Sequence, residues 1–370
     1  MKKKLLLSVL SAVALLILVI SIRLIHVLID MPDVSVLKRY RPAAAAEALD
    51  INGRTITHFF DRTFCIWTPL SSIPDHVVQA VITAEDDTFF EHRGVNFRAT
   101  WDAFIHDVKK GRFARGGSTI TQQMIKNVLL SREKTISRKI REIILARRAE
   151  DILTKHQILE IYMNVVEWGD GVYGVEAASR YYFDKHAAEL RLEEAALLAG
   201  MLPNPRYYDP FKRMAKAMER QSRVLFNMFQ AKLIDEGEYD SAIKAEIRLR
   251  NDFSGGPNSS SIPAANGRPC YQKTLEQVLL SRYGEHSLYR AGLRIRTTID
   301  KDLQDMFLSS HQSGDGVIVI RENGEIRAIA CYDEDSVRTV LKYAGPPYDA
   351  YELSAVSVDS IRPEEVLAGE

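Results

Sequence analysis

The chain has 370 residues, of which 46% are hydrophobic and 26% charged, which is ordinary for a globular protein with one large and one smaller domain. Its 49 basic and 49 acidic residues cancel, so the overall charge excludes a polyacid and a strongly basic nucleic-acid-binding protein, and no nucleic-acid partner is expected. Cys65, Cys270 and Cys331 lack CxxC or Cys/His spacing, which predicts unpaired thiols rather than a zinc site or a disulfide framework.

The first 30 residues are expected to form a cytoplasmic tip and a transmembrane helix. Three lysines at 2–4 precede an uncharged run at 5–22, and the apolar character continues to residue 29. A helix of that length spans a bilayer core of about 30 Å at about 1.5 Å per residue. Lysines on the short leading side predict a cytoplasmic amino terminus, with the rest of the chain outside. The alternative is a cleaved signal peptide, because residues 12–14 resemble a cleavage site.

A short hairpin and then a helical region are predicted after the anchor. An Asn-Gly pair at 52–53 between short alternating segments is typical of a β-hairpin. From Pro74 onward the apolar periodicity is helical, with Asp75 as the expected N-cap, and helical patterns recur to about residue 249. The segment therefore predicts a mainly α domain.

The remaining chain has a different character. Residues 251–269 are rich in Gly, Ser, Asn and Pro, which indicates a linker. Alternation at 293–299 predicts a strand, and an Asn-Gly pair at 323–324 between two apolar segments predicts a second hairpin.

The first group of candidate functional residues is the crowded acidic stretch at 85–94, which begins Glu85-Asp86-Asp87. Adjacent like charges and the apolar helix before them are expected to raise the pKa of one carboxyl toward the range that a general base needs near neutral pH. The alternative is a solvated, frayed helix end.

The second group follows two glycines at 116 and 117, which let the backbone turn tightly and present amide donors at a helix start, where an anion is favoured. A helix that begins near Ser118 would carry a polar face composed of Thr119, Gln122, Gln123 and Lys126. Such a face suits a sugar-phosphate site, or it is ordinary solvent-exposed surface.

The third group is Lys134, Arg138 and Glu142, at successive i+4 steps. Residues 107–148 contain twelve basic side chains against three acidic ones in an otherwise neutral chain. That excess suits a pyrophosphate ligand or anionic lipid headgroups. The alternative is a helix stabilised by ion pairs such as Arg138 with Glu142.

These segments, in this order, resemble the glycosyltransferase domain of peptidoglycan synthases, the family that includes class A penicillin-binding proteins and monofunctional transglycosylases. The patterns EDxxFxxHxG, GxSTITQQ and RKxxE match at 85–94, 116–123 and 138–142. Two further blocks, at 158–164 and 194–200, look like the fourth and fifth family motifs. The resemblance covers roughly residues 31–249.

The resemblance implies a mainly α, lysozyme-like domain at the outer face of the cytoplasmic membrane that polymerises lipid II into β-1,4-linked glycan, with inversion and release of undecaprenyl pyrophosphate. Glu85 would deprotonate the acceptor 4-hydroxyl, and Glu142 would be the second catalytic carboxylate. The residues implied to bind substrate are Asp86, Phe89, His92, Gly117, Ser118, Thr119, Gln122, Gln123, Lys126, Lys134, Arg138, Lys139 and Asn164. The implied partners are lipid II, the lipid-linked glycan chain, the membrane and other cell-wall synthases.

The surroundings of Glu142 modify its implied role. Arg138 and Lys139 lie four and three residues before it and favour its ionised form. A pyrophosphate leaving group needs little protonation when cations or a metal neutralise it. We therefore expect Glu142 to orient these cations or to help bind a divalent ion, Mg²⁺ or Mn²⁺, with proton donation as the alternative. No covalently bound cofactor is expected.

The expected organisation is an anchor at 1–30, the glycosyltransferase domain at 31–250, and at 251–370 a linker with a small α+β remnant of a transpeptidase-side region. A penicillin-reactive site needs SxxK with SDN-like and KTG-like partners. SxxK occurs at 131–134 and 241–244 within predicted helices, but neither KTG nor SDN occurs, so no transpeptidase activity is expected. A lytic lysozyme-like glycosidase and an inactive scaffold that binds lipid II remain the alternative functions.

Overall fold

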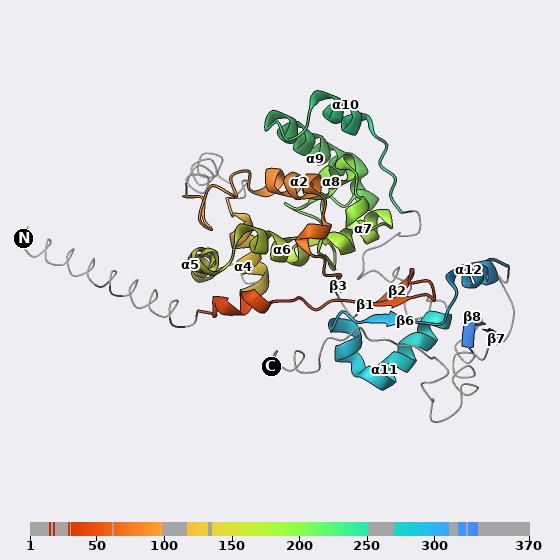
Figure 1. The fold of residues 1–370 in the computed structure, drawn as a ribbon. Helices are drawn as coiled ribbons and strands as arrows, with labels where there is room; N and C mark the ends of the chain where they lie inside the picture. Colours follow the sequence, from red (N-terminus) through yellow and green to blue (C-terminus); the bar gives the residue numbers. More distant parts are fainter. Residues whose placement is uncertain are drawn as a thin grey trace, which may run out of the picture.

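The computed structural model describes residues 31–60, 63–97, 117–131, 135–250, 270–310, 317–322 and 325–331, and the isolated positions 15, 18 and 29. Most of these residues form a helical body, which confirms the predicted mainly α class (Figure 1). Its helices are α2 (Asp75–Glu85), α4 (Ile120–Leu129), α5 (Ile136–Ile152), α6 (Lys155–Val165), α7 (Val175–Phe183), α8 (Leu192–Met201), α9 (Pro210–Gln230) and α10 (Glu236–Lys244). Three short 3-10 helices accompany them: η1 (Val34–Arg39), η2 (Leu70–Ser72) and η3 (Ala187–Glu189).

The predicted transmembrane segment at 1–30 lies outside the described residues, apart from three isolated positions. Among the helices that the structure does describe, none has both the length and the apolar character to cross a bilayer. The predicted linker at 251–269 and Lys134 also lie outside the described residues.

The core of the helical body is centred on α8, which packs against both α2 and α9. Every residue of α8 from 193 to 201 is buried. A Cβ on Gly200 would lie 3.0 Å from the backbone of Arg220, so glycine at this position allows α8 and α9 to approach closely. Both α8 and α9 also pack against α2, the helix that ends at Glu85.

The predicted start of α2 is wrong by one residue. Pro74 is the N-cap, and Asp75 is the first helical residue. A carboxylate in the first turn still favours the helix, because it faces the positive end of the helix dipole.

The predicted first hairpin is confirmed as β1 (Ala46–Leu49) and β2 (Thr55–Phe59), which pair antiparallel. Asp50 holds the turn, because its Oδ1 accepts hydrogen bonds from the backbone N–H groups of Asn52 and Arg54 at 2.9 and 2.7 Å. The strand predicted at 293–299 is shorter, β6 (Arg294–Arg296), and pairs parallel with β1.

These three strands pack on α11 (Cys270–Arg290) and form a second core of Ala46, Ala48, Phe59, Leu275, Leu279, Leu288 and Ile295. Figure 1 shows this group beside the helical body. The amino-terminal hairpin therefore shares its core with residues after 270 rather than with the helices that follow it.

Two further sets of strands complete the described fold. The sheet β3 (Phe64–Cys65), β5 (Val172–Tyr173) and β4 (Glu167–Gly169) lies in the order β3-β5-β4 and was not predicted. The second predicted hairpin is confirmed as β7 (Val317–Glu322) and β8 (Glu325–Cys331), which follow α12 (Lys301–Ser310). Cys65 is a buried free thiol, as predicted, and burial raises its pKa to about 12.

Candidate active site

Glu85 is the last residue of α2 and is partly buried. Its Oε2 accepts a hydrogen bond of 2.6 Å from Nε2 of Gln123 on α4. Burial raises the pKa of Glu85, whereas the Gln123 hydrogen bond and the charges of Arg220 and Lys126 act in the opposite direction. The predicted rise in pKa is confirmed, but burial is its main cause and the adjacent Asp86 charge is a smaller one.

Asp86 lies at the amino-terminal end of α4. Its Oδ2 accepts a hydrogen bond of 3.0 Å from the backbone N–H of Ile120, and Nε2 of His92 lies 3.0 Å from both carboxylate oxygens. The helix start was predicted to favour an anion, and the anion there is the protein's own carboxylate. Because Asp86 fixes the start of α4 beside the end of α2, Gln123 comes within hydrogen-bonding distance of Glu85.

The start of α4 is two residues later than predicted. Thr119 is the N-cap and forms a reciprocal capping box with Gln122, in which each side chain accepts a hydrogen bond from the other residue's backbone N–H. Both side chains are buried. The Thr119 hydroxyl also donates a hydrogen bond of 2.6 Å to the carbonyl of Gly94. Gly94 has a φ of +79°, and a Cβ there would lie 2.6 Å from the carbonyl oxygen of Ala146, so this position requires glycine.

Glu142 lies on α5, with a relative exposure of 2%. Its Oε2 accepts a hydrogen bond of 3.1 Å from Nη1 of Arg138, and its Oε1 accepts one from Nζ of Lys139. Lys139 also donates a hydrogen bond of 2.9 Å to Oγ of Ser118. The predicted contact between Glu142 and the two cations is therefore present.

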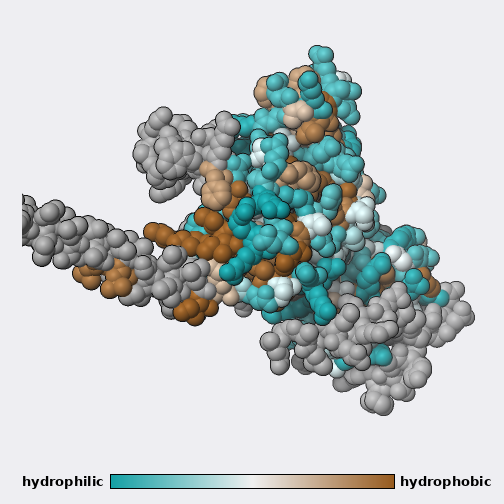
Figure 2. All heavy atoms as spheres, turned by 60° about the vertical axis from the view of Figure 1, so that its left-hand side comes forward, coloured by the Kyte–Doolittle hydropathy of each residue, from teal (hydrophilic) through white to brown (hydrophobic). Residues whose placement is uncertain are grey.

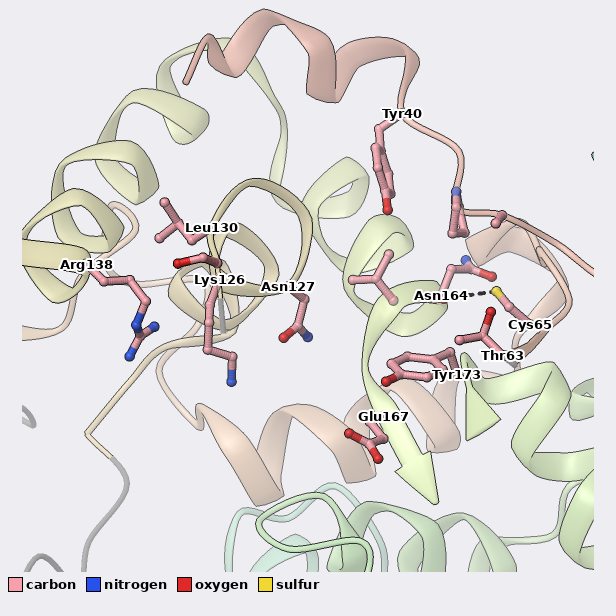
Figure 3. A pocket seen from close by; sticks show the side chains of 14 residues that line it. Tyr40, Thr63, Cys65, Lys126, Asn127, Leu130, Arg138, Asn164, Glu167 and Tyr173 are labelled. Carbon is pink, nitrogen blue, oxygen red and sulfur yellow. Dashed lines mark hydrogen bonds between the residues drawn. The ribbon is translucent and has the colours of Figure 1, made fainter. Parts of the chain in front are cut away.

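A pocket of about 480 Å³ lies beside this cluster (Figure 3). Lys126 and Arg138 extend into it from one side, and Thr63, Glu167 and Tyr173 lie on the opposite side. Nε of Arg138 is buried and has no hydrogen-bond partner in the part of the chain that the structure describes. A buried donor without a partner is uncommon in folded proteins, and it distinguishes Arg138 from the other residues of the pocket wall.

Lys126 gives the pocket its second cation. Burial in the pocket wall lowers its pKa, as do the charges of Arg138 and Lys139, while Glu142 and Glu85 raise it. Within the described ranges the Lys126 ammonium forms no ion pair. An anionic ligand would relieve the repulsion between these three cations.

Several residues predicted to bind substrate have their side chains occupied inside the protein. Asn164 is fully buried, accepts a hydrogen bond of 2.8 Å from the Thr68 backbone N–H, and donates to the carbonyls of Thr68 and Glu160 at 2.8 Å. Phe89 is also fully buried, with the ammonium of Lys155 4.3 Å from its ring centre. Direct substrate contact by Asp86, Phe89, His92, Thr119, Gln122 and Asn164 stays a prediction, and in the described structure these residues hold the elements of the site together.

The transglycosylase family model matches residues 52–229. The biosynthetic peptidoglycan transglycosylase of Dechloromonas aromatica is 45% identical over 159 residues, which cover 43% of this chain and 68% of that protein. The chain belongs to the transglycosylase family. Penicillin-binding protein 1A of Aquifex aeolicus is 34% identical over 313 residues, which cover 84% of this chain and 41% of that protein. This chain thus spans less than half the length of that relative.

One solved structure, penicillin-binding protein 1A of Haemophilus influenzae, aligns with 82% of this chain and 35% of its own, with 19% identity and a TM-score of 0.37.

The described part of the transglycosylase site shows no ready-made ligand set for the predicted divalent ion. Both carboxylate oxygens of Glu142 accept hydrogen bonds from cations, Arg138 and Lys139, which already balance its charge. Among the described residues, no group of three or more His, Cys, Asp or Glu side chains is arranged to hold a metal. The ion stays a prediction, and no step of the proposed reaction depends on it.

Several residues of the transglycosylase site were missed in the sequence. Tyr40, Thr63, Glu167 and Tyr173 line the pocket, and Arg220 acts electrostatically on Glu85. Nothing in the local sequence distinguishes Tyr40 or Thr63. The acidic residues that flank Gly169 could have indicated Glu167, because charged side chains in a short glycine-rich turn often serve a site.

Proposed function

We propose that this chain polymerises lipid II into β-1,4-linked glycan strands of peptidoglycan, with inversion at the anomeric carbon and release of undecaprenyl pyrophosphate. One arrangement carries the proposal: Gln123 and Lys126 lie one turn apart on α4, and Gln123 contacts Glu85 while Lys126 lines the cationic pocket. One helix, α4, therefore carries both the group that contacts the base on α2 and an anion-binding group. The names of the relatives support the same reaction.

Glu85 is the proposed general base. Burial raises the pKa of Glu85, which makes its carboxylate a better proton acceptor than an exposed one. Gln123 holds one carboxylate oxygen at 2.6 Å and leaves the other for the 4-hydroxyl of the acceptor sugar. The hydroxyl proton passes to Glu85, the sugar oxygen forms the new bond to the anomeric carbon, and the electrons of the breaking bond leave with the pyrophosphate.

Lys126, Arg138 and Lys139 are the proposed pyrophosphate-binding groups. Together with Glu142 they carry a net positive charge, which stabilises the negative charge that develops on the leaving group. Glu142 acts by orienting Arg138 and Lys139, since both of its carboxylate oxygens are bound to them. Ser118 also helps to hold Lys139 in place, because its Oγ accepts a hydrogen bond from the Lys139 ammonium.

We also propose that residues 1–30 anchor the chain in the cytoplasmic membrane, with a lysozyme-like catalytic domain at the outer face, where it meets other cell-wall synthases. The uncharged run at 5–22 after three lysines supports an anchor. Figure 2 shows hydrophobic residues gathered where the body meets the amino-terminal end of the described chain. Val36, Phe97 and Ile136 are among the exposed large hydrophobic residues, at 51%, 65% and 82%. Exposed apolar side chains of this size suit a lipid interface.

The experiment is incubation of the purified full-length chain with fluorescent lipid II in detergent, followed by gel separation of the products. Polymer that lysozyme degrades supports the proposal. Shortening of preformed glycan would indicate a lytic glycosidase, and binding without turnover would indicate a scaffold. Either result would overturn the proposed reaction.

A further inference from the structure

Glu167 projects an acidic group into a pocket whose other charged walls are cationic, and the mechanism above gives it no role. We propose that Glu167, positioned by Arg206, is a specificity-determining residue that accepts hydrogen bonds from the sugar whose pyrophosphate lies on Lys126 and Arg138. The identity of that sugar ligand rests on the proposed function, whereas recognition of a sugar diphosphate can be tested without it.

The first argument is the division of charge across the pocket. Lys126 and Arg138 extend from one side, and Glu167 and Tyr173 lie on the other (Figure 3). A diphosphate is attracted to the cations and repelled by a carboxylate, so its place is on the first side. An ionised carboxylate only accepts hydrogen bonds. The Glu167 side therefore suits a neutral group rich in donors, such as sugar hydroxyls and an amide N–H.

The second argument is the local structure of β4, which directs Glu167 toward the pocket. Successive side chains of a strand point to opposite faces. Trp168 is fully buried, and its carbonyl accepts a hydrogen bond of 3.1 Å from the Tyr182 hydroxyl. With Trp168 held in the core, the preceding residue, Glu167, lines the pocket (Figure 3).

The third argument is that Arg206 fixes one oxygen of Glu167 and leaves the other available. Nε and Nη2 of Arg206 each lie 3.3 Å from Oε1 of Glu167, and Nη2 lies 2.9 Å from Oδ1 of Asp170. Oε2 of Glu167 has no partner among the residues described. Arg206 is 63% exposed, and ion pairs this exposed add little to stability. Its contribution is orientation of the carboxylate.

The fourth argument is size. At about 480 Å³ the pocket falls within the range of roughly 300–1,000 Å³ that is usual for small-molecule sites. A pyrophosphate alone fills only part of this volume. The remainder, on the side of Glu167, accommodates the attached sugar.

Asp170 offers a matched control, because it shares the contact with Arg206 but does not line the pocket. In the full-length chain, Glu167→Ala and Asp170→Asn are compared by titration calorimetry with two probes, inorganic pyrophosphate and a lipid II analogue with a short prenyl chain. Glu167→Ala is expected to weaken binding of the analogue about tenfold, the effect of losing one charge-assisted hydrogen bond. Its affinity for pyrophosphate is expected to stay the same or to increase, and Asp170→Asn is expected to bind both probes within twofold of the parent.

Steady-state kinetics give a second readout. Glu167→Ala is expected to raise KM for lipid II about tenfold and to leave kcat within threefold, because Glu167 contacts no reacting atom. Equal weakening of both probes, or the same loss in Asp170→Asn, would overturn the proposal, as would unchanged binding of the analogue. If the parent binds the analogue through Glu167 but makes no polymer, the proposed function fails and this inference stands. If the parent chain makes polymer, and Glu167→Ala binds the analogue and turns over lipid II as the parent does, this inference fails and the proposed function stands.

Discussion

Asp86→Asn tests how the site is assembled. Asp86 is 8% exposed, and its carboxylate accepts the Ile120 N–H and contacts His92, both at 3.0 Å. Asparagine keeps one acceptor oxygen but loses the negative charge at the start of α4. Loss of a hydrogen bond to a charged group costs about 1.5–3 kcal/mol, so we expect the free energy of unfolding to fall by about 2 kcal/mol.

The same substitution should slow polymerisation. Without the carboxylate, the start of α4 is free to shift, and Gln123 loses its alignment with Glu85. Small displacements of positioning groups reduce rates by roughly 10- to 100-fold.

Asp87→Asn is the matched control, because Asp87 is the adjacent acid and is exposed. It should change the free energy of unfolding by less than about 0.5 kcal/mol. Chemical denaturation of both full-length variants in the same detergent, with the lipid II assay run alongside, gives the comparison. An Asp86→Asn protein as stable and as active as Asp87→Asn would refute the assembly of the site through Asp86.

Three further predictions concern other parts of the site. Glu142→Gln should weaken binding of the lipid-linked donor and also slow turnover, because the substitution releases Arg138 and Lys139. Slower turnover with unchanged donor affinity would instead assign Glu142 the role of proton donor. Lys126→Met removes a cation that lowers the pKa of Glu85, so the acidic limb of the pH profile of kcat/KM should move to higher pH, and a shift to lower pH would contradict this assignment. Gly94→Ala should destabilise the protein by about 1–3 kcal/mol, because φ at this position is +79° and the new Cβ would meet the Ala146 carbonyl. Thermal stability equal to that of the parent would show that the turn relaxes and would contradict this prediction.

The sequence predicted the parts of the site that depend on local pattern. The apolar helix before Glu85 was one of two reasons to expect a raised pKa, with a solvated helix end as the alternative, and burial is the main cause in the structure. The spacing of Arg138, Lys139 and Glu142 indicated contacts one helical turn apart, which the structure has. Such features were predictable because both partners lie within a few residues of each other.

Features that depend on tertiary contacts were not predictable in the same way. Asp86 accepts a hydrogen bond from a helix start 34 residues later in the chain, and local sequence patterns do not show which anion lies at a helix start. Tyr40 and Glu167 lie on the same pocket although they are far apart in the sequence. The first hairpin packs against α11, a contact that only the folded chain reveals.

The central claim is that Glu85 removes the proton from the acceptor sugar. Because burial raises the pKa of Glu85 above its value in the unfolded chain, the ionised carboxylate destabilises the fold at pH values above both, and neutral glutamine removes that penalty. Glu85→Gln should therefore be at least as stable as the parent near neutral pH. The decisive measurement is polymerisation of fluorescent lipid II by Glu85→Gln, with thermal unfolding as the check on folding. We expect a folded protein that makes no polymer, and residual activity within about tenfold of the parent would contradict the account.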